Sequence, residues 1–483
     1  MHPEFTGLDI VVLVAYVVGV MALGTWLGGR QRDARDYFLA GRSVPWWAIC
    51  FSVVATETSA LTFISLPATA YAGDLYFLQI ALGYIIGRFV IAYVLLPRYF
   101  AGELVTAYQL LEQRFGLDTR RFASVIFMVT RAFADSVRIF AAAIPIALIT
   151  GLPYWQSIVL AGAVTLAYTY HGGLRAVIWI DVVQMGLYIF GGVASLYMLV
   201  HLVPGGWGAI AQTADAAGKL RIIHLEGGFA SGRWLLTGLV GGAFLSMASH
   251  GVDHLIVQRL LAAGSLRHAR RALIGSGLIV FLQFALFLVV GLGLYSYYGA
   301  REFAVADEVL PRFIVEGLPA GLSGLIVAGI LAAMMSTVSS SLNSLASATT
   351  HDLYAPLRRG IDDAELMKAG RRFTLLWAAI LIGGALLFQL VQQGTPIVEI
   401  ALQIASFTYG GLLGGFALAV LTKRPDQRDA ITGIAAAIAV MTLLWGAQQF
   451  ALMPRVVAGL WFSLIGAAVT MGAGLLSMKL RRS

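Results

Sequence analysis

The amino-acid sequence predicts an all-α integral membrane protein with about 13 transmembrane helices. Hydrophobic residues make up 59% of the 483 residues and charged residues only 12%, roughly half the charged fraction of a typical soluble domain. Apolar runs of about 20 residues, the length that a helix needs to cross a bilayer, recur from one end of the chain to the other. The runs are continuous and do not alternate with polar residues, so they exclude a transmembrane β-barrel.

The expected helices form a single transmembrane domain over residues 1–483, with no room for a soluble domain. They cover residues 8–28, 45–73, 77–97, 122–150, 153–170, 176–202, 234–256, 272–298, 318–348, 373–393, 397–421, 429–450 and 456–478. The first apolar segment is too long for the core of a cleavable signal peptide, so we expect it to remain as a helix. The single cysteine, Cys50, excludes a disulfide within the chain.

The distribution of Lys and Arg predicts how the chain crosses the membrane. Thirteen spans place the two termini on opposite sides. With the N-terminus outside and the C-terminus in the cytoplasm, basic residues favour the cytoplasmic loops by about four to one, as the positive-inside rule requires. The net charge of +8 is therefore interpreted as membrane topology, and no nucleic-acid partner is expected. We expect a multi-pass protein of the plasma (inner) membrane that does not require an oligomer.

Two expected spans are interrupted by small and polar residues. The second contains Ala55–Ala60, with Glu57 in its middle, and the seventh contains Ser246–Gly251, just before Asp253. Broken helices at corresponding positions are typical of an inverted repeat with a binding site at the membrane midplane. Close helix packing through small residues is the alternative interpretation of both segments.

The ninth span has a hydroxyl-rich face. Its polar residues at helical spacing are Ser336, Ser339, Ser340 and Asn343, with Thr337 beside them. Hydroxyl groups, together with carbonyls freed by a broken helix, supply the neutral oxygens that a hard monovalent cation prefers. Asp181, near the start of the sixth span, is either a further cation ligand or a charge at a helix N-terminus.

Charged residues within the spans are costly in lipid and usually mark function, with a partner nearby. Glu57 lies at the first break and Arg88 in the third span. Arg131 and Asp135, one turn apart on the fourth span, are interpreted as a local ion pair. Arg138 has no acid at i±4, so we expect it either to bind an anionic substrate or to be neutralised by Glu57.

Four motifs resemble those of the sodium/solute symporter family, which includes sodium/glucose, sodium/proline, sialic acid and sodium/iodide symporters. They are Asp36–Arg42, Gly172–Val177 followed by Asp181 and Gln184, Asp253 with Gln258 and Arg259, and the run Ser336–Asn343. The resemblance implies a LeuT-like core of two inverted five-helix repeats, at about 45–202 and 234–421, whose first and sixth core helices are broken. An extra first helix at 8–28 precedes the core, and two peripheral helices at 429–478 follow it.

The resemblance also implies two sodium sites. The residues of the first are Ala55, Thr58, Ala333, Ser336 and Thr337, with carbonyls from the first two and from Ala333 and hydroxyls from the last two. The second site consists of Asp181, Ser339 and Ser340, with Ser336 shared between the two. Na⁺ is the only metal expected.

The expected substrate-binding residues are Glu57, Thr62, Arg138, Ser249, His250 and Gln403. Gln403 resembles the sugar-binding glutamine of the glucose carriers, and Glu57 stands where the proline carriers have an acid. Sugar carriers have an aromatic gate before Asp253, whereas this chain has Ser249 and His250, which argues against a sugar. The segment from Ser59 to Pro67 resembles the branch that carries iodide, monocarboxylates and vitamins.

Together these features predict a sodium-coupled symporter, not an enzyme, that imports a small polar organic solute by alternating access. The resemblance of the Ser59–Pro67 segment to the anion-carrying branch favours a carboxylate or other anion over a neutral sugar or amino acid. Proton coupling through Glu57 is a second alternative. A membrane solute sensor without transport activity is the alternative from another class of protein.

Overall fold

The computed structural model describes residues 6–28, 33–102, 104–150, 152–303, 306–358, 360–391, 397–449, 453–454 and 456–482. Within these residues the regular structure is helical, apart from one isolated bridge between Val44 and Ala263. All thirteen expected spans fall on helices, which confirms the all-α prediction.

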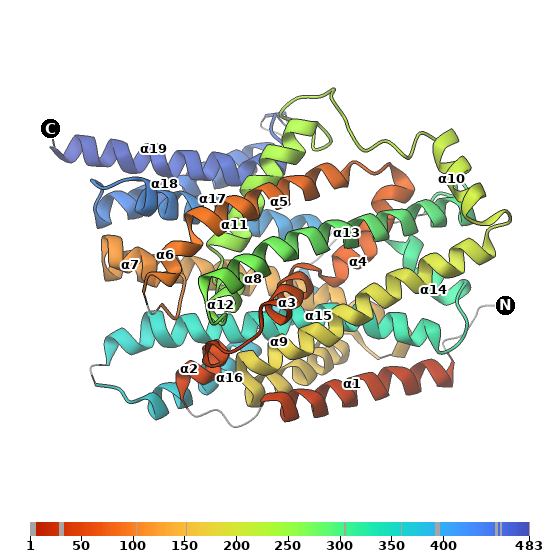
Figure 1. The fold of residues 1–483 in the computed structure, drawn as a ribbon, viewed down its shortest axis with the longest axis horizontal. Coiled ribbons are helices and arrows are strands. Elements are labelled where there is room, and N and C mark those ends of the chain that lie inside the picture. Colours follow the sequence, from red (N-terminus) through yellow and green to blue (C-terminus); the bar gives the residue numbers. More distant parts are fainter. Residues whose placement is uncertain are drawn as a thin grey trace.

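The long helices run roughly parallel to one another along the longest axis of the molecule (Figure 1). The helices of the expected spans, including the pieces of the two broken spans, are α1 (Gly7–Gly28), α3 (Trp46–Glu57), α4 (Ala60–Ala72), α5 (Phe77–Val94), α8 (Leu117–Thr150), α9 (Tyr154–Leu202), α11 (Gly242–Gly251), α12 (His254–Leu261), α13 (Leu266–Tyr298), α15 (Leu322–Ala348), α16 (Asp363–Val391), α17 (Ile397–Leu421), α18 (Gln427–Gln449) and α19 (Phe462–Arg482). Connecting helices are α2 (Ala34–Leu39), α6 (Leu96–Phe100), α7 (Gln109–Phe115), α10 (Gly206–Ala216) and α14 (Val309–Glu316), and a π-helical turn, η2, at Thr237–Gly241 precedes α11.

Eight helices of the described chain are long and apolar enough to cross a membrane, and α3 with α4 forms a ninth crossing that is bent by 63°. The seventh expected span is divided between α11 and α12, and α9 contains two expected spans.

The division of α9 lies at Gly173. A straight helix of its 49 residues would be about 74 Å long, more than twice the roughly 30 Å core of a bilayer. Gly173 interrupts the helix with φ 54° and ψ −158°, a conformation that favours glycine. A Cβ atom there would lie 2.6 Å from the carbonyl oxygen of Tyr37, so the close approach of α2 also requires glycine. The Gly172–Val177 motif therefore joins the fifth and sixth spans.

Helix α15 occupies the centre of the bundle. In its most apolar stretch 89% of the residues are buried, against 56% or less for the other crossing helices of the described chain. It packs against α1, α3, α4, α8, α9, α12 and α16. The hydroxyl-rich face predicted from the sequence therefore lies inside the protein and faces other helices.

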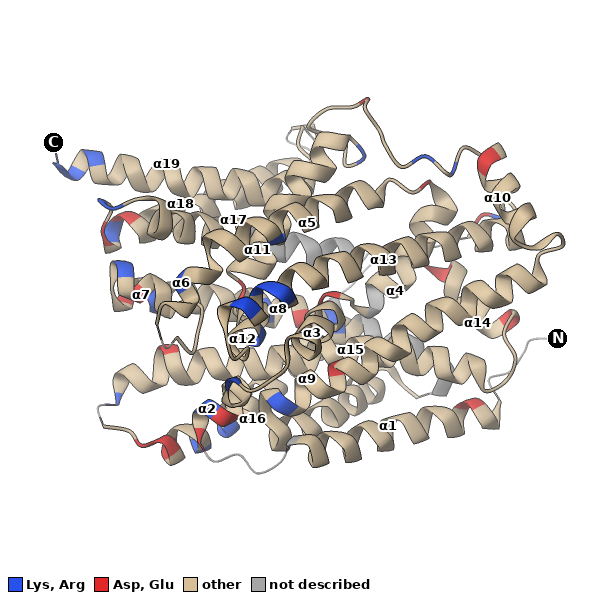
Figure 2. Ribbon diagram, in the orientation of Figure 1, with Lys and Arg blue, Asp and Glu red and all other residues tan. Residues whose placement is uncertain are grey.

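Charged residues are distributed unevenly along the long axis. Figure 2 shows most Lys and Arg at the end of the bundle where α7 lies and α19 terminates, while α1 begins at the opposite end. A second group of charges lies in the middle of the bundle, around α3, α8 and α12 (Figure 2). The first group fits one membrane face, whereas the second requires partners inside the protein.

Candidate ion and substrate site

The first break separates α3 from α4 at Thr58 and Ser59, inside the segment where the sequence predicts it. Both residues have extended backbone conformations, and the Ser59 hydroxyl caps α4 by accepting the Thr62 N–H at 3.4 Å. Because α3 ends at Glu57, the carbonyls of its last turn, including that of Ala55, have no N–H partner within the helix. A broken helix offers such carbonyls to a cation.

The second break lies at Val252 and Asp253, between α11 and α12. The expected position, Ser246–Gly251, is wrong, because these residues continue α11. The small residues there serve close packing against α5 instead: a Cβ atom on Gly87 would lie 3.0 Å from the Ser246 Cβ atom, and one on Gly251 would lie 2.4 Å from Cδ1 of Ile91. The new helix begins where the Asp253 carboxylate accepts the Leu255 N–H at 2.9 Å.

Neighbouring side chains form hydrogen bonds and an ion pair with the polar groups of the second break. The Tyr99 hydroxyl donates to the carbonyl oxygen of Gly251 at 2.6 Å, so this carbonyl is already satisfied. The Asp253 carboxylate accepts a hydrogen bond from the Tyr409 hydroxyl and lies 3.6 Å from a guanidinium nitrogen of Arg131. The acid at this break is therefore a cap with polar partners on three sides.

The residues of the first expected sodium site lie where α15 meets the first broken span. The Thr337 hydroxyl is 3.1 Å from the Ala333 carbonyl oxygen, which brings two expected ligands together. One turn further along α15, the Ser340 hydroxyl lies 3.3 Å from that of Thr56 on α3. This contact places the end of α3 beside the Ser336 turn of α15.

The residues of the second expected site form a buried cluster. Asp181 accepts hydrogen bonds from the hydroxyls of Ser336, at 2.6 Å, and Ser52. The hydroxyls of Ser339 and Ser340 both donate to the Ser336 carbonyl oxygen. Ser336 therefore belongs to both groups of residues, with its hydroxyl on Asp181 and its carbonyl oxygen shared by two serines.

The counter-charge of Asp181 is Arg259 of α12, whose guanidinium lies 3.2 Å from the carboxylate and also donates to Ser340. Both side chains are fully buried. Asp181 lies eight residues after Gly173, well inside the second half of α9, so it is not a charge at a helix N-terminus.

Both broken spans contribute to a cluster around Glu57. Arg88 of α5 forms an ion pair with the Glu57 carboxylate and donates to Ser276 at 2.7 Å. His250 of α11 has its Nε2 atom 3.5 Å from the same carboxylate. The Ser249 hydroxyl is 2.8 Å from Nδ1 of His250. Three expected substrate residues, Glu57, Ser249 and His250, are thus brought together.

Arg138 has an acidic neighbour that the sequence interpretation missed. Its guanidinium lies 2.7 Å from Asp135, three residues earlier on α8. Asp135 also accepts from Ser341 and pairs with Arg131 at 3.2 Å, which confirms the expected Arg131–Asp135 ion pair. The expected alternative of neutralisation by Glu57 is wrong, because Glu57 pairs with Arg88. Thr62 lies in the first turn of α4, 3.3 Å from Ser59 between their hydroxyl oxygens.

The side chain of Gln403, the remaining expected substrate ligand, lies outside the described residues.

The end of α4, which is the last part of the first broken span, is held in place by Lys219, in the connection between α10 and η2. Its ammonium group donates to the carbonyl oxygens of Tyr71, at 2.6 Å, and Gly73, at 3.1 Å, just at the end of α4. It also lies 4.2 Å from the centre of the Tyr295 ring. Burial lowers the pKa of the Lys219 ammonium, and nearby Asp74 opposes that shift. The contacts fix the end of α4 to α13.

Arg88, Arg259 and Ser52 were absent from the expected site. The sequence did contain a sign that Arg88 belongs to the site, because a charge inside a membrane span needs a partner. Arg259 belongs to the motif after Asp253, although that motif does not identify its acid. Ser52 gave no signal, because a single serine in an apolar helix can bond to its own backbone.

Comparisons with known proteins agree with this architecture. The model of the sodium:solute symporter family matches residues 37–437. The sodium/sialic acid symporter NanT of Aliivibrio fischeri is 28% identical over 454 residues, covering 92% of this chain and 88% of that protein. The human sodium-coupled monocarboxylate transporter 1 is 30% identical over 463 residues, covering 92% of this chain and 75% of that protein.

Solved structures extend the similarity to the whole fold. A Na⁺-coupled sialic acid symporter in a substrate-bound outward-open state superposes with a TM-score of 0.88 at 26% identity, covering 99% of this chain and 98% of that chain. Mhp1, a nucleobase-cation-symport-1 family transporter, gives a TM-score of 0.59 at 14% identity and shows the fold alone. These similarities confirm the expected LeuT-like fold.

Proposed function

We propose that this chain, which belongs to the sodium:solute symporter family, imports a small organic anion such as a carboxylate together with sodium. Membership of the family makes it a multi-pass membrane protein and a sodium-coupled symporter that works by alternating access. A symporter releases its solute unchanged, so we assign no catalytic residue and propose that the chain is not an enzyme.

The environment of Arg138 is the main support for an anionic substrate. Charges alternate along a row formed by Asp253, Arg131, Asp135 and Arg138. Arg131 and Asp135 each lie between two opposite charges, whereas Arg138, at the end of the row, has only Asp135 among the described residues. Its side chain is 21% exposed, against 5% for Arg131 and 0% for Asp135.

A guanidinium at the end of such a row suits an anion. The ion pair with Asp135 uses the Nη1 atom of Arg138, which leaves N–H donors in the planar fork that binds a carboxylate with two parallel hydrogen bonds. The neutral-solute alternative needed Glu57 to neutralise Arg138, but Glu57 pairs with Arg88. Two relatives are also named for acids, sialic acid and monocarboxylates.

We propose that sodium binds at the first break. The proposed ligands are the carbonyls of Ala55, Thr58 and Ala333 with the hydroxyls of Ser336 and Thr337. The contact of Thr56 on α3 with Ser340 on α15 supports this set, because it brings the two helices together one turn from Ser336. A cation that bridges α15 to the broken span couples to transport only if it binds one state of the carrier better than the other.

A second ion is proposed at Asp181, Ser339 and Ser340, with Ser336 shared. The carboxylate and hydroxyl oxygens already converge there on the Ser336 turn. Asp181→Asn is expected to lower the sodium-to-solute ratio by one, measured from reversal potentials in proteoliposomes. Because this change leaves Arg259 without its acid, the double variant Asp181→Asn/Arg259→Gln is the matched control. An unchanged ratio in both variants would make Asp181 a structural residue.

The proposal extends to the orientation of the chain in the membrane and to the order of its repeats. We place the N-terminus outside and the C-terminus in the cytoplasm of the plasma (inner) membrane, because Lys and Arg gather at the end of the bundle where α19 terminates (Figure 2). Helix α1 precedes a first repeat at about 45–202 and a second at about 234–421, and two peripheral helices at 429–478 follow.

Counterflow in proteoliposomes tests the substrate class. We expect sodium-dependent exchange of sialic acid or lactate and none of glucose or proline. Arg138→Lys and Arg138→Gln are both expected to reduce uptake by tenfold or more, while the stabilisation of the purified protein by sodium remains. Arg233→Lys, at an exposed arginine between α10 and η2, is the control. Near-normal uptake by Arg138→Lys would rule out bidentate binding of a carboxylate by Arg138. Exchange of glucose or proline alone would contradict the proposal that the substrate is an anion.

A further inference from the structure

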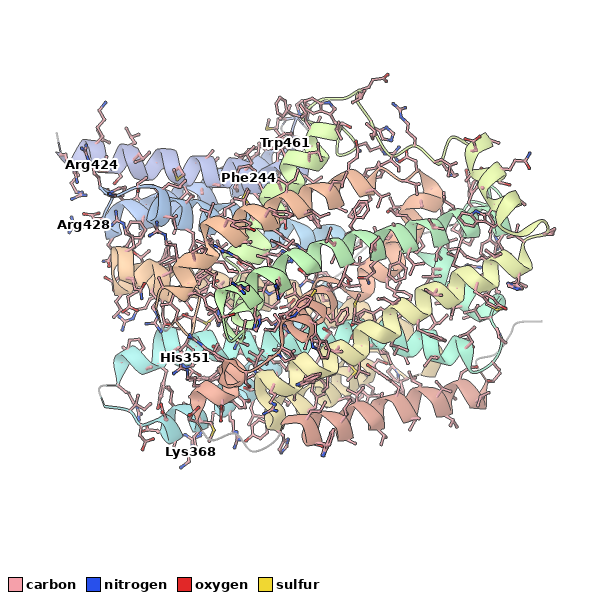
Figure 3. The ribbon with its side chains drawn as sticks, viewed as in Figure 1. Phe244, His351, Lys368, Arg424, Arg428 and Trp461 are labelled. Atoms are coloured by element: carbon pink, nitrogen blue, oxygen red, sulfur yellow. The ribbon has the colours of Figure 1, made fainter. Side chains whose placement is uncertain are left out.

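An apolar groove of about 510 Å³ opens on the membrane-facing surface between α5, α11, α17 and α19. Val90, Phe244, Met247, Ala417, Ala468 and Met471 are among its lining residues, and every lining residue of the described chain is hydrophobic. Its volume falls in the range of pockets that hold small molecules. In Figure 3, Phe244 marks its position between α5 and α19, on the opposite side of the molecule from Lys368.

The groove extends to the end of the bundle where basic residues gather. Leu95 and Leu421 belong to its lining. Arg98 follows Leu95 by three residues and Lys423 follows Leu421, the last residue of α17, by two, so each cation is close to the lining along the chain. Arg424 comes next, and the side chains of all three are exposed.

These cations are available to a ligand. Within the described chain no acid pairs with Arg98, Lys423 or Arg424. The acids of the neighbouring loop are committed elsewhere, because Asp426 and Asp429 both pair with Arg481 of α19. The mouth of the groove therefore has unpaired positive charge, while its interior offers only hydrocarbon surface.

We propose that this groove is a binding site for an anionic phospholipid of the leaflet at the C-terminal end of the bundle. An acyl chain occupies the groove, and the phosphate lies between Arg98 and Lys423. Hydrocarbon necessarily fills an apolar groove in a bilayer, and basic residues at the end of such a groove select an anionic headgroup. Basic loop residues alone would not explain the apolar groove beside them. An ordinary lipid-facing helix surface would not explain the unpaired cations at the end of the groove.

The position of the lipid connects it to transport. Helix α5 packs against α11 on one side of the groove, and α17 packs against α19 on the other. Helix α11 is the first half of the second broken span, and Met247 lies about one turn before the break at Val252. A bound chain therefore contacts α11 just before the second break and α17 together, so we expect it to affect the transport rate of a carrier that works by alternating access.

Native mass spectrometry of the full-length protein with mixed phosphatidylglycerol and phosphatidylcholine tests the site. We expect the wild type to retain phosphatidylglycerol in preference to phosphatidylcholine. Arg98→Gln/Lys423→Gln is expected to reduce that preference by at least about tenfold, because two cations are lost. Lys368→Gln/Arg372→Gln removes the same charge from α16, on another side of the molecule, and is expected to keep the wild-type preference. Ala417→Phe fills the groove and is expected to displace both lipids.

Uptake in liposomes gives an independent readout. Sodium-driven counterflow is expected to rise when phosphatidylglycerol is added to phosphatidylcholine for the wild type and the Lys368→Gln/Arg372→Gln control, but not for Ala417→Phe. An equal loss of lipid preference in both charge variants would reduce the site to general surface charge and overturn the proposal. If the wild type were dimeric without lipid and the Ala417→Phe variant were monomeric, a second copy of the chain would cover the groove. That result would also overturn the lipid proposal.

Discussion

The two broken spans share an acid paired with an arginine, but they differ in which polar backbone groups are left without partners. Each break has an acid, and an arginine from another helix faces each acid: Arg88 of α5 for Glu57 and Arg131 of α8 for Asp253. Glu57 is the last residue of the helix before its break, whereas Asp253 is the last residue of its own break and caps the following helix. The acid is therefore a helix C-terminal charge in one span and an N-terminal charge in the other.

This difference decides which break can bind a cation. An acid at a helix N-terminus is favoured by the backbone dipole and satisfies free N–H groups. At the second break Tyr99 also satisfies the Gly251 carbonyl oxygen. At the first break no N–H group of the described chain donates to the carbonyls of residues 55–57, and the Ser340 hydroxyl of α15 lies 3.3 Å from the Thr56 hydroxyl in the same turn. A break in a helix thus creates an ion site only where its carbonyls are left without donors.

The largest expected effect comes from the ion pair of the first break. Arg88→Met is expected to lower the free energy of unfolding by about 3 kcal/mol, because it leaves the largely buried Glu57 carboxylate without its guanidinium. Glu57→Gln/Arg88→Met is expected to recover most of this loss. Thermal unfolding in detergent without sodium measures both. If the single variant were no less stable than the double variant, the pair would not hold the break together.

A smaller effect is expected from the two caps. Asp253→Ala removes the acceptor of the Leu255 N–H and of the Tyr409 hydroxyl, so it is expected to cost about 2 kcal/mol. Ser59→Ala removes a long cap bond of 3.4 Å and is expected to cost less than about 1 kcal/mol. Ser265→Ala, at the cap of the unbroken α13, is the control for Ser59. Equal losses at Asp253 and Ser59 would contradict the contrast between the breaks.

Local periodicity explains what could be predicted from the sequence. The thirteen spans, the first break and the hydroxyl face of α15 all follow from patterns within one segment. The second break was misplaced, because the small residues of Ser246–Gly251 give the same signal when they pack against α5. The acid beside Arg138 was missed because only i±4 was considered, although residues three apart also face each other on a helix.

Partners far apart in the sequence could not be predicted. Glu57 and Arg88 are 31 residues apart, and Asp181 and Arg259 are 78 apart, so their pairing depends on how whole helices pack. Motifs indicated that Asp181 and Arg259 mattered, but not that they meet. The division of α9 at Gly173 likewise depends on the approach of Tyr37 from a distant segment.

Sodium activation of uptake tests the central claim, that the first break and α15 form the ion site. Ser336→Ala and Thr337→Ala are each expected to raise the half-saturating sodium concentration by about tenfold or more, equivalent to about 1.4 kcal/mol. Ser344→Ala, two turns further along α15 and equally buried, is expected to leave it unchanged. If sodium activation of well-folded Ser336→Ala and Thr337→Ala matched that of the wild type, sodium would bind elsewhere and the account would be contradicted.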